Sequence, residues 1–273
     1  MIFGLEDLKK LWRPREDSDG EDNGQVTIIG GSSLFHGAPM LAAKAASRIV
    51  DMVFFASPER ELEKVAKLNS FIWIPWEEIE DYAAKSDAVL IGPGFLRFRS
   101  EKISNEERRL ACDEECMKTK EITKHLLEKF PDKKWVIDGG SLQVMDAKWI
   151  PQNAVITPNK KEFEILFGAE KPEDMARKYE CVIVSKGPTG YVTDGETTYE
   201  IKGGNAGLTK GGTGDVLAGI TVGLLAKNPP LLAAAAGAYL IKKTAEALYE
   251  KVGYNFNADD VSEKVFEMFK NLG

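Results

Sequence analysis

A glycine-rich turn followed by an apolar helical segment is the part of this sequence best suited to chemistry. The turn consists of Gly211, Gly212, Thr213, Gly214 and Asp215. Glycine lets the backbone approach an anion closely, and the free N–H groups and the dipole at a helix start favour negative charge. The turn therefore predicts a nucleotide-phosphate site in which the candidate catalytic residues Gly212, Thr213 and Gly214 form the cradle for the anion.

Asp215 falls in the first turn of the predicted helix, beside the anion site, where its carboxylate can accept a proton. An aspartate at this position also stabilises the helix dipole. That structural role does not account for three glycines in four positions, because each glycine costs backbone entropy. The pattern therefore favours Asp215 as a catalytic base.

Two further segments could complete a nucleotide site. Lys186 follows an apolar run and either meets a phosphate or ribose or is simply solvated. Asn159 and Glu162 open another helical segment, and this Asn-x-x-Glu spacing either holds a hydrated Mg²⁺ through Glu162 or forms a capping box. The candidate nucleotide-binding residues are Lys186, Gly187, Pro188, Thr189, Gly190, Asn205, Gly207, Thr209, Gly211 and Gly214.

A second group of residues is a candidate substrate end. Residues 37–39 open an alanine-rich helical segment with a proline near its first position, where another anion or a substrate could bind. His36 either contacts substrate or caps a turn. The candidate substrate-binding residues are Gly31, Ser32, Gly37, Ala38, Pro39, Gly94, Asp138, Asn159 and Asp215.

The elements that position these residues are short apolar runs alternating with helical segments, which is typical of a parallel sheet covered on both faces. Strands are expected at 26–29, 53–55, 71–74, 88–91, 135–137, 155–156 and 181–184, with a hairpin over 191–201 that turns at Asp194 and Gly195. Helices are expected at 5–12, 39–49, 105–130 and 160–167, and from 216 onward with breaks at 228–230 and 253–257. The glycine turns fall at the carboxyl ends of the strands, where open sheets bind ligands.

Composition limits the classes of function. The chain has 273 residues and a formal net charge of −7, which argues against a nucleic-acid partner. Three cysteines do not suggest a disulfide scaffold and fit a reducing compartment, and two histidines offer little for zinc. No apolar run reaches the ~20 residues of a bilayer span, and the first ten residues do not form a signal peptide. We therefore expect a cytoplasmic protein without a membrane partner, built as a helix and polar lead-in over 1–24 and one catalytic domain over 25–273.

Taken together and in order, these motifs resemble the ribokinase-like superfamily and, within it, the ADP/ATP-dependent NAD(P)H-hydrate dehydratase family. The resemblance runs from about Arg13 to the C-terminus. It is carried by Gly30-Gly31-Ser32, Gly37-Ala38-Pro39, Gly92-Pro93-Gly94, Thr157-Pro158, Glu162-Phe163, Lys186-Gly187 and the stretch 211–219. The chain departs from the family where Asn159 replaces histidine, where Gly139-Gly140 follows Asp138, at Phe95-Leu96 and at 50–52.

The resemblance implies a three-layer α/β/α fold with a mostly parallel sheet, and a lyase that repairs hydrated NADH or NADPH. ADP or ATP would be the co-substrate and Mg²⁺ the cofactor. The substrate hydroxyl would be phosphorylated and the phosphate then eliminated. Many members form tetramers, so a homo-oligomer is expected. Two alternatives stay open: an ATP-dependent kinase of a small alcohol such as a vitamin precursor or sugar, and a nucleotide-binding protein without catalysis.

Overall fold

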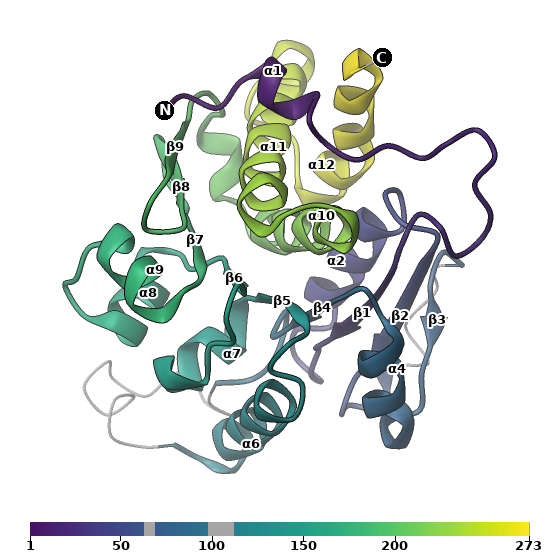
Figure 1. Cartoon of the computed structure of the whole chain (residues 1–273), viewed down its shortest axis with the longest axis vertical. Helices are drawn as coiled ribbons and strands as arrows, with labels where there is room; N and C mark the ends of the chain where they lie inside the picture. The colour runs from purple at the N-terminus through teal and green to yellow at the C-terminus, as the bar shows by residue number, and fades with distance from the viewer. Residues whose placement is uncertain (63–68, 98–111, 273) are drawn as a thin grey trace.

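The computed structural model describes residues 1–62, 69–97 and 112–272, and within them a nine-stranded sheet runs through the middle of the molecule (Figure 1). The strand order is β3-β2-β1-β4-β5-β6-β7-β8-β9. The bounds are β1 Gln25–Ile29, β2 Met52–Ala56, β3 Ile72–Trp73, β4 Ala88–Ile91, β5 Lys134–Ile137, β6 Val155–Ile156, β7 Val182–Ser185, β8 Gly190–Thr193 and β9 Thr198–Ile201. Neighbouring strands from β3 to β7 pair in parallel, whereas β8 and β9 add antiparallel.

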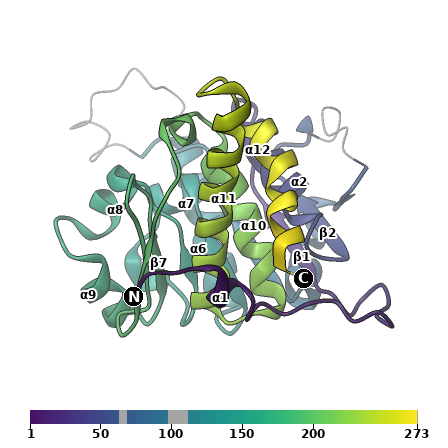
Figure 2. The same ribbon diagram turned by 90° about the horizontal axis from the view of Figure 1, so that it is seen from above.

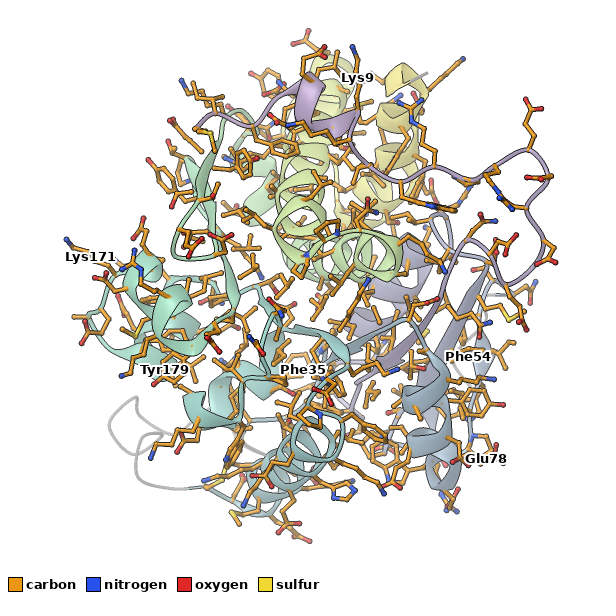
Figure 3. All side chains as sticks on the ribbon, in the orientation of Figure 1. Lys9, Phe35, Phe54, Glu78, Lys171 and Tyr179 are labelled. Carbon is orange, nitrogen blue, oxygen red and sulfur yellow. A yellow bond between two sulfur atoms is a disulfide. The ribbon has the colours of Figure 1, made fainter. Side chains whose placement is uncertain are left out.

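The strands are apolar at successive positions because both faces of the sheet are covered. In β4, for example, Ala88 and Leu90 belong to the core cluster on one face, and Val89 and Ile91 belong to the cluster on the other. Phe54 of β2 points from the sheet toward Tyr82 of α4 (Ile79–Lys85), with ring centroids 4.8 Å apart (Figure 3). The predicted three-layer α/β/α architecture is thereby confirmed.

Helices cover each face. One face carries α2 (Gly37–Ala46), α10 (Thr213–Lys227), α11 (Pro230–Val252) and α12 (Ala258–Lys264). The other carries α4, α6 (Glu114–Lys129), α7 (Gly139–Val144), α8 (Lys160–Phe167) and α9 (Pro172–Tyr179). Four 3₁₀ helices are also present: η1 Trp76–Glu78, η2 Ala147–Trp149, η3 Ala206–Thr209 and η4 Val265–Leu272. None of the helices in these residues combines the length and the apolarity that crossing a bilayer requires.

The N-terminal lead-in differs from the expected helix over residues 5–12. Helix α1 spans only Leu5–Leu8, and the chain then crosses the ends of α11 and α10 toward β1 (Figure 2). Phe3, Leu8 and Leu11 are nevertheless buried in the same core cluster as the main helices. The lead-in therefore packs on the main helices rather than standing apart from them.

Two features of the cysteine region differ from expectation. Helix α6 begins at Glu114, after the N-cap Asp113, and residues 105–111 of the predicted helix lie outside the described residues. Cys112 and Cys116 form a disulfide, with Cα atoms 5.2 Å apart, so the expectation of reduced cysteines was wrong for this pair. The two positions meet because Cys112 stands just before the first helical turn, within the distance that a disulfide needs. The bridge spans one turn only and links no distant elements.

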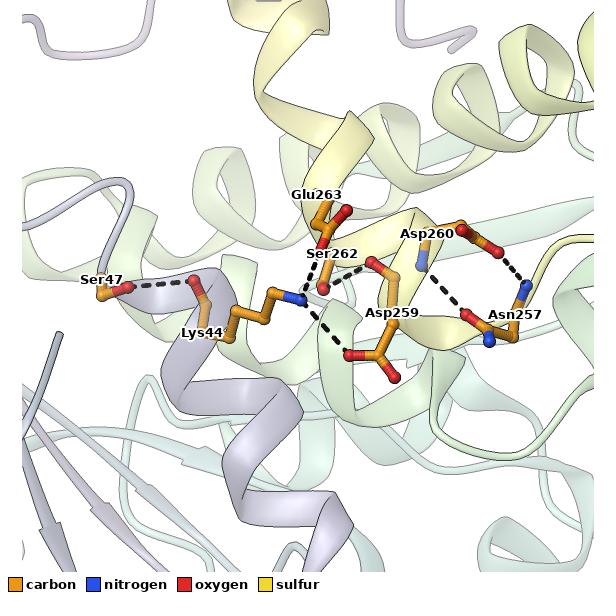
Figure 4. Close-up of polar contacts among 7 residues, drawn as sticks. All are labelled: Lys44, Ser47, Asn257, Asp259, Asp260, Ser262 and Glu263. Atoms are coloured by element: carbon orange, nitrogen blue, oxygen red, sulfur yellow. Dashed lines mark hydrogen bonds and ion pairs between the residues drawn. The ribbon is translucent and has the colours of Figure 1, made fainter. Parts of the chain in front are cut away.

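An ion-pair cluster fixes the start of α12 against α2 (Figure 4). Nζ of Lys44 on α2 lies 3.3 Å from Asp259 and 2.9 Å from Glu263 of α12. The side chain of Asn257 caps α12 by accepting a hydrogen bond from the backbone N–H of Asp260. This arrangement matters for the site because Ala258, the first residue of α12, lies against the glycine turn that precedes α10.

Candidate functional site

A cavity of about 780 Å³ lies at the carboxyl edge of the sheet, bordered by the ends of β5 and β7, the turn 205–215 and α11. A volume of this size suits a nucleotide-sized ligand. The predicted residues that line it are Asp138, Asn159, Glu162, Lys186, Gly187, Pro188, Gly190, Asn205, Thr209, Gly211, Gly212, Thr213, Gly214 and Asp215. The topology brings them together because parallel strands end at the same edge.

The glycine turn has the geometry of an anion site. Gly212 is the N-cap of α10 with φ +93° and ψ −22°, a left-handed conformation that favours glycine. The Thr213 hydroxyl locks the turn by donating to the carbonyl oxygens of Leu208 at 2.7 Å and Lys210 at 2.9 Å. The backbone N–H of Val216 makes the first helical hydrogen bond, to the Gly212 carbonyl. The N–H groups of Gly214 and Asp215 therefore have no acceptor within the helix, as at any helix start.

One lysine and one aspartate from the ends of β7 and β5, the two strands that flank β6, meet beside this turn. Lys186 follows β7, and its Nζ lies 3.1 Å from Oδ1 of the buried Asp138, which follows β5. The same Oδ1 accepts a hydrogen bond of 2.7 Å from the Thr157 hydroxyl. Lys186 Nζ also lies 3.3 Å from the position that a Cβ on Gly214 would occupy. The ammonium group is thus adjacent to both the carboxylate and the anion turn.

The electrostatics of the cavity shift three pKa values. Burial, followed by repulsion from Asp138, raises the pKa of Asp215 to about 7 although Lys186 opposes the shift. Burial lowers the pKa of Lys186, but the charges of Asp138 and Glu162 outweigh it, so the net shift is upward. Burial and Asp138 also raise the pKa of Glu162. The cavity therefore holds a carboxylate poised near neutral pH beside a lysine that stays charged.

Asn159 and Glu162 form the capping box at the start of α8. The Asn159 side chain accepts from the Glu162 N–H at 3.0 Å, and Glu162 Oε2 accepts from the Asn159 N–H at 2.8 Å. Glu162 Oε1 accepts from Gln143 Nε2 at 2.9 Å, and Arg97 in turn donates to Gln143. The capping box and a role in holding hydrated Mg²⁺ are therefore compatible for this motif. The cap fixes the position of the Glu162 carboxylate, and each carboxylate oxygen keeps a lone pair.

The donor set suits a cation held mainly through water and phosphate. Within the described part of the chain, no group of three or more His, Cys, Asp or Glu side chains could hold a metal ion alone. Magnesium is commonly held by one or two carboxylates together with waters and substrate phosphates. Asp138, Glu162 and Asp215 lie around Lys186, and the other two lysines of the cavity, Lys210 and Lys242, donate to backbone carbonyls. A polyphosphate in this cavity would therefore need a further positive charge. The side chains of the cavity therefore fit a Mg²⁺ ion whose remaining ligands are waters and phosphate oxygens.

Several predicted nucleotide-binding residues have structural tasks. The Asn205 side chain accepts from Gly207 N at 2.9 Å and donates to the Ala245 carbonyl at 2.7 Å. The Thr209 hydroxyl donates to the Ala206 carbonyl. Gly207 lies against the Phe256 ring, where a Cβ would come within 2.1 Å. Asn205 and Thr209 still line the cavity, whereas Gly207 and Thr189 do not.

The turns predicted to bind substrate lie elsewhere on the same edge. Gly31, Ser32, Gly37, Ala38, Pro39 and Gly94 do not line this cavity. Instead they pack together: the Gly31 N–H donates to the Pro93 carbonyl at 2.8 Å, and a Cβ on Gly94 would come 2.3 Å from the Phe35 carbonyl. Close packing thus accounts for Gly31 and Gly94, whereas a Cβ on Gly37 would meet no atom within 4 Å. Substrate binding by these six residues stays a prediction.

Sequence reasoning missed some residues that line the cavity, among them Lys210 and Lys242. Lys210 donates to the backbone carbonyls of Tyr254 and Phe256, and Lys242 of α11 donates to those of Pro188 and Ile201. A lysine within the alanine-rich and leucine-rich helix 231–248 is a signal that could have drawn attention to position 242. His36, by contrast, is exposed at the N-cap of α2 and makes no side-chain cap.

Comparison with known proteins identifies a matching family model and sequence relatives of this chain. A family model described as NAD(P)H-hydrate dehydratase matches residues 26–267. The ADP-dependent (S)-NAD(P)H-hydrate dehydratase of Cenarchaeum symbiosum is 32% identical over 98% of this chain and 96% of that protein. The bifunctional NAD(P)H-hydrate repair enzyme Nnr of Methanocaldococcus jannaschii is 34% identical, over 98% of this chain and 52% of that protein. The chain thus spans about half the length of such bifunctional relatives.

Solved structures agree on the fold. A ribokinase-like superfamily protein from Enterococcus faecalis superposes with a TM-score of 0.82 at 22% identity, covering all of this chain and 96% of that one. The ADP/ATP-dependent NAD(P)H-hydrate dehydratase of Bacillus subtilis, co-crystallised with ATP and Mg²⁺, also gives 0.82 at 21% identity, covering all of this chain and 98% of that one. The predicted ribokinase-like fold is confirmed.

Proposed function

We propose that this chain, which belongs to the NAD(P)H-hydrate dehydratase family, repairs hydrated NADH or NADPH with ADP or ATP as co-substrate. The observation that carries the proposal is the cavity in which Asp215, with a pKa raised to about 7, stands beside the helix-start amides. A binding protein without catalysis would have no use for a carboxylate tuned in this way. The substrate class in this proposal is taken from the relatives, and the reaction chemistry is inferred from the geometry of the cavity.

The proposed first step is phosphoryl transfer to the hydroxyl of the hydrate. Asp215 accepts the hydroxyl proton as the new P–O bond forms, and the bond between the terminal phosphorus and its bridging oxygen breaks to release AMP or ADP. The helix-start N–H groups of Gly214 and Asp215 and the ammonium of Lys186 stabilise the charge on the transferred group. Phosphate then leaves with the C–O bonding pair and the adjacent ring carbon loses a proton to water, which restores the C=C bond of the dihydronicotinamide ring.

Asp138 has a supporting role in this proposal. Its Oδ1 holds Lys186 at 3.1 Å and is itself held by Thr157. Lys186 is thereby kept at the mouth of the anion turn and charged. The phosphate of a bound nucleotide would then take one of the three N–H donors of the ammonium.

Mg²⁺ would bind between the nucleotide phosphates and the acidic side chains of the cavity, Asp138, Glu162 and Asp215. Glu162 would act through water, since each of its oxygens already accepts one hydrogen bond. When bound, the ion would neutralise the charge that builds up on the phosphate oxygens. The residues listed above as nucleotide-binding and substrate-binding belong to this proposal, including the turns at 31–32, 37–39 and 94 that lie outside the cavity.

We extend the proposal to the setting of the protein. The net charge of −7 supports a protein without a nucleic-acid partner, and cytoplasmic action and a homo-oligomer, a tetramer by family resemblance, are expected. Sedimentation analysis tests the assembly.

The decisive experiment supplies chemically hydrated NADH, Mg²⁺ and ADP or ATP, and follows the absorbance of the reduced nicotinamide. Recovery that depends on the nucleotide supports the proposal. Absence of recovery, together with stable phosphorylation of a small alcohol, would instead favour the kinase alternative. Nucleotide binding by calorimetry without turnover of any candidate would favour the non-catalytic one.

A further inference from the structure

Lys242 is a buried cation whose ammonium holds two backbone segments together. Its residue is only 7% exposed, and Nζ donates to the carbonyl of Pro188 at 2.7 Å and to that of Ile201 at 2.9 Å. Pro188 lies in the turn between β7 and β8, and Ile201 is the last residue of β9. The two carbonyls therefore lie at the open end of the β8–β9 hairpin, where Gly190 pairs with Ile201, and a single side chain of α11 links the turn before β8 to the end of β9.

The free-energy cost of burying the Lys242 ammonium indicates that this side chain does more than fill space. Removing an ammonium group from water is expensive, and burial lowers the pKa of Lys242. Among the described residues, no carboxylate lies within 4 Å of Nζ to form an ion pair. A hydrophobic side chain of similar length would fill the same space without that cost.

The backbone around Lys242 is shaped to admit it. A Cβ on Gly204 would come within 3.0 Å of Lys242 Cγ, and one on Gly190 within 3.5 Å of Cε. Both glycines line the cavity, as does Lys242. The side chain thus forms part of the cavity wall, between the 187–190 turn and the loop at 203–204.

The neighbouring positions of α11 hold the other loop of the same wall. Residues three and four positions apart share a helix face, and Ala245 and Glu246 follow Lys242 at that spacing. The Ala245 carbonyl accepts from Asn205 Nδ2 at 2.7 Å, and Glu246 Oε1 accepts from the Gly204 N–H at 3.0 Å. One face of α11 therefore anchors both the turn at 187–190 and the loop at 203–207, and Lys242 is the cationic member of this set.

We propose that Lys242 is a positioning residue for the nucleotide: its ammonium joins the 187–190 turn to the end of β9 and so pre-forms the wall against which ADP or ATP binds. The inference rests on the proposed nucleotide dependence of the enzyme. Because Lys242 acts through loop backbone and not through Asp215 or Lys186, its loss should weaken nucleotide binding without slowing the chemical step.

The test compares Lys242→Met, which keeps the length and removes the charge, with Lys251→Met, an exposed change on the same helix. Wild-type binding of ADP with Mg²⁺ is measured first by titration calorimetry. We expect Lys242→Met to weaken ADP binding by about tenfold or more and to raise the nucleotide KM similarly. The kcat and the KM for the hydrate should stay within about threefold of wild type, and Lys251→Met should change none of these values.

Three results would overturn the inference or its basis. An unchanged ADP affinity in Lys242→Met would overturn the positioning role alone. A fall in kcat and a rise in the hydrate KM together with the loss of affinity would show general loosening of the site instead. No binding of ADP or ATP by the wild type would overturn the proposed function itself. If Lys242→Met does not fold, Lys242→Gln, a neutral donor, serves in its place with the same expected loss.

Discussion

Nζ of Lys186 lies 3.1 Å from Oδ1 of Asp138 and faces the start of α10, so one ion pair joins the end of β5 to the anion turn. The pair explains why the cavity can hold both a charged lysine and a carboxylate that titrates near neutrality. Asp138 keeps Lys186 protonated, while its negative charge makes ionisation of the nearby Asp215 less favourable. The consequences for catalysis and stability can be measured separately.

Asp215→Asn should abolish turnover and preserve nucleotide binding. The variant keeps the size of the side chain but cannot accept the hydroxyl proton, so kcat should fall by a factor on the order of 10² or more. ADP affinity, measured by calorimetry, should stay close to wild type because the helix-start amides remain. Glu170→Gln, an exposed change outside the cavity, is the control. Near-normal turnover in Asp215→Asn would rule out Asp215 as the base.

The pH profile should show the titration of Asp215. A base works only when deprotonated, and its pKa is raised to about 7, so kcat/KM should fall about tenfold per pH unit below that value and level off above it. Lys186 does not interfere, because its raised pKa keeps it charged across this range. Measurements from pH 5.5 to 9 with saturating nucleotide test this. A profile that stays flat down to pH 5.5 would contradict the assignment.

Because of the same raised pKa, ionised Asp215 should destabilise the folded protein. The group binds its proton more tightly in the folded protein than in the unfolded chain, so stability is lost as pH rises from about 4 to about 7. Asp215→Asn should therefore unfold at a higher temperature than wild type at pH 8, with a gain of roughly 1–3 kcal/mol after allowing for solvent and for the lost helix-dipole interaction. At pH 3 the gain should vanish. A gain that is equal at both pH values would show that charge is not its cause.

Sequence patterns predicted most of the fold because the strands are short, apolar and separated by helices. The strand at 88–91 and the helix at 160–167 agree with β4 and α8 residue for residue. The pattern failed where long-range packing decides: residues 9–12 continue an amphipathic run yet leave the helix, and Leu11 packs into the core as irregular chain. The glycine turn at the start of α10 was predictable from local sequence alone. Lys242 was not, because its value depends on which carbonyls the tertiary fold brings to it.

Glu162 should set the requirement for Mg²⁺. Glu162→Gln keeps the capping box with Asn159, since glutamine also caps at this position, but it removes the charge that would hold a hydrated ion. The Mg²⁺ concentration needed for half-maximal activity should rise about tenfold or more, and EDTA should abolish activity in both proteins. The control is Glu164→Gln, an exposed change on the same helix. An unchanged Mg²⁺ requirement would mean that Glu162 serves only as a cap.

Gly212→Ala should damage the anion turn, whereas Gly211→Ala should not destabilise the protein. Gly212 has φ +93°, and a Cβ there would come within 2.6 Å of Leu41 Cδ1 and 2.8 Å of Ala258 Cβ. Backbone strain alone costs about 1–3 kcal/mol, and the clash with α12 adds to it. Gly211 has neither problem, since no atom lies within 4 Å of its Cβ position. Thermal unfolding of the two variants should therefore differ by several degrees, and ADP affinity should fall in Gly212→Ala as the Gly214 and Asp215 amides shift. Equal unfolding temperatures would show that the turn relaxes easily and that its left-handed geometry is not required.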